Sequence, residues 1–183
     1  MNTASPVSTG NSDGAGRENS AGRADGAWQP PSALQRLAII RRSRTVAIVG
    51  ASSNPARASY FVATYLLSSS TDFTVWMVNP RETEILGQPV YPSLADLPGR
   101  PDIVDVFRRP ADLPAVAEEA VAVGAGAFWA QLGLHSDEAV EIAHRAGLDA
   151  VTNRCLKIEH ARFAGGLHLA GFNTGVISSR RAL

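Results

Sequence analysis

The sequence has little cysteine, no net charge and no long apolar run. Its single cysteine, Cys155, excludes an internal disulfide and a metal centre built from several cysteines. Lys plus Arg and Asp plus Glu each number 17, so no overall charge draws the chain to nucleic acid or to an anionic membrane. No apolar run approaches the roughly 18 residues of a membrane span, and the N-terminus lacks the apolar centre of a secretory signal. We therefore expect a cytoplasmic protein with no membrane or nucleic-acid partner.

The composition of the 183 residues, 45% apolar and 19% charged, is typical of one globular domain. Residues 1–32 are rich in Gly, Ser, Asn and Ala. Because such a segment has too little apolar surface to offset the entropy lost on ordering, we expect a disordered N-terminal tail. The domain is expected over residues 33–163, and residues 164–183 are expected to form a C-terminal extension.

Short β-branched runs alternate with amphipathic segments along the domain. This alternation predicts an α/β fold, a doubly wound parallel sheet in three layers with helices on both faces. Strands are predicted near 45–50, 73–78, 102–107, 126–130 and 149–152. Helices are predicted near 56–68, 111–123 and 136–146, with a short helical turn near 93–97.

A further helix is predicted to start after Ser32, which is typical of a helix N-cap. Leu34, Leu37, Ala38 and Ile40 are spaced to form its apolar face. We expect this face to pack onto the edge of the sheet.

The most informative segment is TVAIVGASSNP, residues 45–55. A buried strand that runs into a turn of small residues and then a helix lets the backbone approach an anion and directs unpaired N–H groups at it. The dinucleotide fingerprint needs Gly at the third and sixth positions from Gly50, where this chain has Ser52 and Pro55. The segment therefore predicts a nucleotide-like ligand and disfavours a conventional nicotinamide site.

Residues that follow the predicted strands are expected to meet, because ligands of doubly wound sheets lie beyond the carboxyl ends of the strands. This set contains three arginines and no acidic residue: Gly50, Ala51, Ser52, Ser53, Asn79, Pro80, Arg81, Arg108, Arg109, Pro110, Gln131, Leu132 and Gly133. Arginine after the second strand suits an extra ribose phosphate, which NADP and coenzyme A (CoA) both carry. Alternatively, the arginines are solvated or pair with Asp105, Glu82 or Glu84.

The residues offer little catalytic chemistry. The four histidines are not spaced as a metal pair, no serine lies in a nucleophile elbow, and no paired carboxylates flank the expected cleft. Cys155 is either a reactive thiol beside Arg154 and Lys157 or a small buried apolar side chain. Phe107 either contacts an adenine ring or packs in the core. We expect no metal site.

The chain resembles the small single-domain CoA-binding proteins, whose fold is similar to the CoA-binding domain of the succinyl-CoA synthetase α subunit and of the ADP-forming acyl-CoA synthetases. The resemblance covers residues 45–160. The segments that carry it are VAIVGASSNPARASYFVATYLL (46–67), VNPRETEILGQPVYPSLADLP (78–98), DIVDVFRRPADLPAVAEEAVAVGA (102–125), FWAQLGLHSDEAVEIAHRAGLDAV (128–151) and NRCLKIEH (153–160).

This resemblance implies a role for each group of residues. The CoA pyrophosphate is expected on Gly50, Ala51, Ser52 and Ser53, with Arg57, Ser59 and Tyr60 shaping the turn; the adenosine phosphate portion is expected against Asn79, Pro80 and Arg81; the adenine and ribose are expected beside Phe107, Arg108 and Arg109; the pantetheine arm is expected along Gln131 and Gly133. The last segment departs from the family pattern, because Asn153 stands where an acidic residue is usual. An acidic role at that position is therefore in doubt.

The resemblance implies non-catalytic binding of CoA or an acyl-CoA by a monomer or homodimer. The larger synthetases carry a phosphorylatable histidine in a second domain, for which we expect no room before Leu183. Two alternatives stay open. One is an NADP-type nucleotide-binding oxidoreductase, and the other is the CoA-binding subunit of a split acyl-CoA synthetase.

Overall fold

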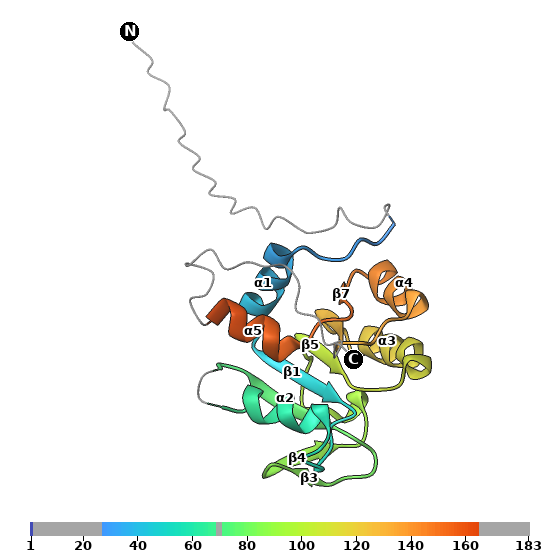
Figure 1. Cartoon of the computed structure of the whole chain (residues 1–183). Coiled ribbons are helices and arrows are strands. Elements are labelled where there is room, and N and C mark those ends of the chain that lie inside the picture. The colour runs from blue at the N-terminus through green and yellow to red at the C-terminus, as the bar shows by residue number, and fades with distance from the viewer. Residues whose placement is uncertain (2–26, 69–70, 165–183) are drawn as a thin grey trace.

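A central sheet of seven strands organises the described part of the chain. The computed structural model describes residues 1, 27–68 and 71–164 (Figure 1). The strand order is β3-β4-β2-β1-β5-β6-β7. All neighbouring strands are parallel except β3 and β4, which are antiparallel. The strands are β1 (Thr45–Val49), β2 (Thr74–Val78), β3 (Glu84–Ile85), β4 (Gln88–Tyr91), β5 (Ile103–Val106), β6 (Ala127–Ala130) and β7 (Asp149–Val151).

Helices cover both faces of this sheet (Figure 1). Residues of α1, α2 and α5 pack on one face, and residues of α3 and α4 pack on the other. The predicted doubly wound α/β fold in three layers is therefore confirmed. The helices are α1 (Ala33–Arg42), α2 (Ala58–Leu66), α3 (Leu113–Ala122), α4 (Asp137–Arg145) and α5 (Leu156–Ala164), with short 3₁₀ turns at Leu94–Asp96 and Pro110–Asp112.

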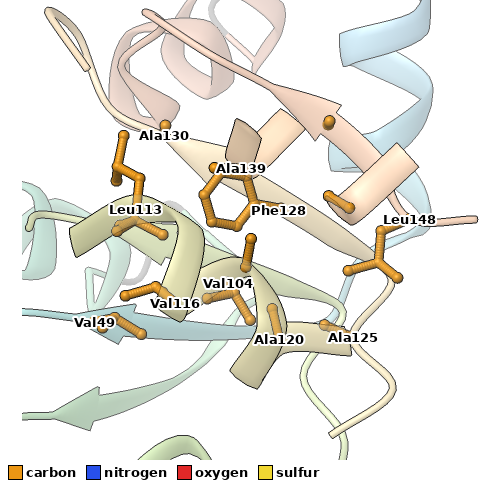
Figure 2. Packing of buried hydrophobic residues seen from close by; sticks show 14 of the residues in the cluster. Val49, Val104, Leu113, Val116, Ala120, Ala125, Phe128, Ala130, Ala139 and Leu148 are labelled. Carbon is orange, nitrogen blue, oxygen red and sulfur yellow. The ribbon is translucent and has the colours of Figure 1, made fainter. Parts of the chain in front are cut away.

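The core follows from the alternation of side chains along each strand. Val104 and Phe128 point to the face covered by α3 and α4, where Leu113 and Ala139 meet them (Figure 2). Their strand neighbours point the other way and form a second cluster under α1, α2 and α5. Because the central strands are buried on both faces, their sequences are almost continuously apolar.

The structure adds a hairpin of two strands and a helix that were not predicted from the sequence. One is the β3–β4 hairpin, whose two-residue turn has Leu86 and Gly87 at φ 54° and 71°, as a type I′ turn requires. The other is α5, which packs against α1 and α2.

The predicted apolar face of α1 was right only in part. Ile40 is buried and Leu37 is half-buried, but Leu34 and Ala38 are exposed, and Arg36 and Ile39 are buried instead. The helix packs against α5 rather than only at a sheet edge. The Arg36 Nε donates to the Glu159 carboxylate of α5 at 2.9 Å, which compensates both buried charges and selects this face.

Most of both expected end segments lies outside the described residues. The N-terminal tail was expected over residues 1–32, and its last residues are described. There, Trp28 packs against the α3/α4 side of the core, and its indole N–H donates to the Ala150 carbonyl at 3.2 Å. Within residues 27–68 and 71–164, no helix combines the length and the apolar character that crossing a bilayer requires.

Candidate anion-binding site

Gly50 places the turn after β1 against the ends of two neighbouring strands. Its N–H donates to the Val78 carbonyl of β2 at 3.0 Å. Its φ is +86°, and a Cβ at this position would lie 2.6 Å from the backbone oxygen of Phe107, which follows β5. Only glycine meets both conditions. The structure therefore shows a close approach between Gly50 and the backbone after β5, while the predicted approach of this turn to an anion stays a prediction.

Asn79 ties the end of β2 to the same turn. Its Nδ2 donates to the Ala51 carbonyl at 2.7 Å, and its Oδ1 accepts from the Arg81 N–H at 2.9 Å. Ala51 is buried, Ser52 is half-buried and Ser53 is exposed. The structure thus brings the residues predicted after β1 and after β2 together.

Helix α2 starts at Ala58, after the four residues 54–57 that follow this turn, and has no capping side chain. Arg57 occupies its N-cap position and makes no side-chain cap bond, and no acidic residue lies in the first turn. In contrast, α1 and α4 are capped by Ser32 and Ser136. An uncapped N-terminus leaves backbone N–H groups and the positive end of the helix dipole available to an anion. Of the helix residues predicted to shape the site, Ser59 is buried and Tyr60 is half-buried.

A carboxylate already uses one amide of this turn. The Ser53 N–H donates to Oε2 of Glu82 at 2.9 Å. The prediction that no acidic residue reaches this edge was therefore wrong. From the sequence, Glu82 was expected only as an alternative partner for arginine, because its position within the irregular segment after β2 gives no periodic signal.

The arginines of the predicted site take different positions. The Cδ of Arg108 lies 3.4 Å from the point where a Gly50 Cβ would be, so this side chain lies beside the turn. Arg109 instead pairs with Asp112 through two hydrogen bonds of 3.0 Å and is exposed. Arg57 and Arg81 are exposed, as is Pro80, and Phe107 packs against the core under α2 and α5.

Gln131 and Asp105 form a buried polar pair beneath the edge. The Gln131 Nε2 donates to Asp105 Oδ1 at 2.6 Å, so the side chain predicted to line the pantetheine path points into the protein. Asp105 is 0% exposed, and its Oδ2 has no hydrogen-bond partner among the described residues. Burial therefore raises the pKa of Asp105 to about 8, against the smaller opposing effect of Gln131. This second acidic residue was missed as a site feature because it lies within a strongly apolar strand.

Two further candidate residues, Gly133 and Cys155, have structural surroundings. Gly133, at φ +84°, donates its N–H to Oδ1 of Asn153 at 2.8 Å. Burial raises the pKa of the Cys155 thiol, which opposes the reactive-thiol reading. In the described part of the chain, no three His, Cys, Asp or Glu side chains gather where they could hold a metal ion.

The geometry of the turn after β1 is typical of an anion-binding site. The glycine turn lies beside the Arg108 stem and is tied to the end of β2 by Asn79, and the chain continues from it to the uncapped N-terminus of α2. The Ser53 N–H donates to an anionic oxygen in this structure, that of the Glu82 carboxylate. The protein is thus a Rossmann-like α/β domain with a candidate anion-binding turn at the carboxyl ends of its strands.

Comparison with known proteins identifies the family. The model of the CoA binding domain family matches residues 44–161, and the chain belongs to this family. The YneT protein of Bacillus subtilis (strain 168) is 38% identical over 133 residues, which are 73% of this chain and 97% of that protein. A solved structure from Pyrococcus horikoshii OT3 has a TM-score of 0.68 and 36% identity, over 74% of this chain and 96% of that one.

A larger relative links the domain to a ligase. The acetate–CoA ligase (ADP-forming) I of Archaeoglobus fulgidus is 30% identical over 133 residues. The match covers 66% of this chain but only 19% of the ligase. The chain is therefore related to one domain of an ADP-forming ligase.

Proposed function

We propose that this chain binds CoA or an acyl-CoA and catalyses no reaction on it. The diphosphate would lie on the turn from Gly50 to Ser53 and at the N-terminus of α2. The observation that carries the proposal is the anionic oxygen held by the Ser53 amide beside an uncapped helix. Membership of the CoA binding domain family supports CoA as the ligand.

The other positions follow from the same placement. Asn79 would orient the turn, and the exposed Pro80 and Arg81 would lie on the side of the adenosine phosphates. Phe107 and Arg108 would lie beside the adenine and ribose. In this proposal Gln131 does not contact the ligand, because its Nε2 donates to the buried Asp105 beneath the pantetheine path.

The proposal further places the protein in the cytoplasm, with a small-molecule nucleotide as its partner. The equal numbers of acidic and basic residues give no overall charge that would draw the chain to nucleic acid or anionic lipid instead. The similarity to one domain of an acetate–CoA ligase favours a second candidate, the CoA-binding subunit of a split acyl-CoA synthetase. CoA binding by the isolated chain is common to both candidates.

The test is thermal unfolding of the full chain with CoA, acetyl-CoA or NADPH. Ligand at about 100 times its dissociation constant raises the free energy of unfolding by about 2.7 kcal/mol. This corresponds to a Tm increase of about 5–10 °C for a domain of this size. We expect this increase with CoA or its thioester and none with NADPH. An increase with NADPH alone would contradict the proposal.

A matched pair of variants locates the site. Ser52→Glu places a negative charge on the turn and should remove the Tm increase through repulsion of the diphosphate. Ser52→Gln adds a side chain of similar size without charge and should keep most of it. Equal responses of the two variants would move the site away from this turn.

A further inference from the structure

Glu82 is a half-buried acid that lies on the turn proposed to hold a diphosphate. We infer that Glu82 is an internal anion that occupies the Ser53 amide in the absence of ligand and that a ligand phosphate must displace. This inference concerns the regulation of the proposed CoA site and rests on that proposed function. It makes Glu82 a determinant of affinity rather than a group that binds the ligand.

The contact is built by the chain that follows β2. Asn79 binds Ala51 through its Nδ2 and the Arg81 N–H through its Oδ1. These two bonds hold the start of the segment after β2 against the turn, and Glu82 follows Arg81 in this segment. The Glu82 carboxylate accepts from the Ser53 N–H at 2.9 Å.

The electrostatics favour a carboxylate at this point. The N–H groups near the start of α2 carry partial positive charge, and α2 has no acidic residue in its first turn. A hydrogen bond from a backbone N–H to a charged oxygen is stronger than one to a neutral oxygen. Glu82 thus places a negative charge on the Ser53 N–H, in the loop that leads into α2.

Carboxylate and phosphate compete for the same donor. The Ser53 N–H has one hydrogen to give, and two negative groups within a few ångströms repel each other. A bound diphosphate must therefore move Glu82 away from Ser53. The measured affinity is then the intrinsic affinity reduced by the free energy of that displacement.

The experiment compares Glu82→Gln with the control Glu84→Gln in the full chain, by calorimetric titration with CoA and with dephospho-CoA. Glutamine keeps the length of Glu82 but loses the charge, so we expect Kd to fall about five- to fifty-fold for both ligands. Glu84 is exposed on β3, two residues along the chain. Its variant changes the net charge equally and should change Kd less than about two-fold.

Each ligand separates one cause from another. Dephospho-CoA lacks the 3′-phosphate but keeps the diphosphate, so displacement from the turn predicts a gain with both compounds. A gain with CoA alone would overturn the inference, because Glu82 would then oppose the 3′-phosphate. Weaker binding by Glu82→Gln would also overturn it, since Glu82 would then contact the ligand.

A measurement without ligand keeps the inference separate from the proposed function. In ¹⁵N–¹H spectra of the free protein, Glu82→Gln should shift the Ser53 amide resonance and Glu84→Gln should leave it in place. An unmoved Ser53 resonance in Glu82→Gln would overturn the contact itself. If the resonance moves but neither wild type nor variant binds CoA, the proposed function fails while the contact stands.

Discussion

Asp105→Asn should change how stability depends on pH. Asp105 is fully buried, and burial raises its pKa from the ordinary 3.8 to about 8. Between these values the folded protein holds a proton that the unfolded chain releases. Asp105 therefore contributes full stability below about pH 4, and this contribution is lost as pH rises towards 8.

The magnitude follows from the size of the window. One pKa unit corresponds to about 1.4 kcal/mol, so from pH 5 to pH 7 the wild type should lose roughly 3 kcal/mol through this group alone. Asparagine cannot ionise, and its Oδ1 can still accept from Gln131. The free energy of unfolding of the variant minus that of wild type should therefore rise by about 3 kcal/mol over the same interval.

The assay is urea unfolding at half-unit steps from pH 5 to pH 8, for wild type, Asp105→Asn and Glu118→Gln. Glu118 is exposed on α3 and serves as a control for loss of one carboxylate. Its difference from wild type should stay flat across the range. A flat difference for Asp105→Asn would refute the account, because the carboxyl would then be ionised in the folded protein.

Three other substitutions test the fold and the turn. Gly50→Ala should lower the free energy of unfolding by about 1–3 kcal/mol and weaken CoA binding, because the added Cβ would lie 2.6 Å from the Phe107 oxygen. Urea unfolding measures the stability, and calorimetry measures the binding. An unaltered stability would contradict the close approach. Arg36→Ala should cost about 3–5 kcal/mol by leaving the buried Glu159 carboxylate without its main partner, as urea unfolding at pH 7 would measure; a loss below about 1 kcal/mol would show that the pair is solvated. Ser136→Ala should cost about 1 kcal/mol through loss of the α4 cap, with no change in CoA affinity; a change in affinity would link α4 to the site.

The parallel strands and their helices were predictable because their signals are local and periodic. The strand predicted near 102–107 is observed at Ile103–Val106, and the helix predicted near 136–146 is observed at Asp137–Arg145. Gly124 and Gly147, where helices were expected to end, have φ values of +68° and +80°. Buried parallel strands are nearly all apolar, which makes them easy to recognise.

The missed elements depend on tertiary contacts. The β3–β4 hairpin has Leu86 at a turn position that usually carries Asn or Asp, so its turn signal is weak. Helix α5 mixes charged and apolar residues, and its buried Glu159 is stabilised by Arg36 of α1, which lies more than 100 residues earlier. No local pattern contains that pair.

The candidate site was predictable in its backbone and less so in its charges. The small residues around Gly50 predict the turn, because only small residues allow its geometry. The contact between Glu82 and Ser53 joins two loops, and the pKa of Asp105 depends on its complete burial in the folded chain. Neither property is visible from residue type or spacing alone.

The most direct test of the central claim is a crystal structure of the chain with bound CoA. We predict diphosphate oxygens within about 3 Å of the Ser53 N–H and of the first amides of α2, with the Glu82 carboxylate displaced from Ser53. CoA bound elsewhere, with the contact between Glu82 and Ser53 intact, would contradict the claim.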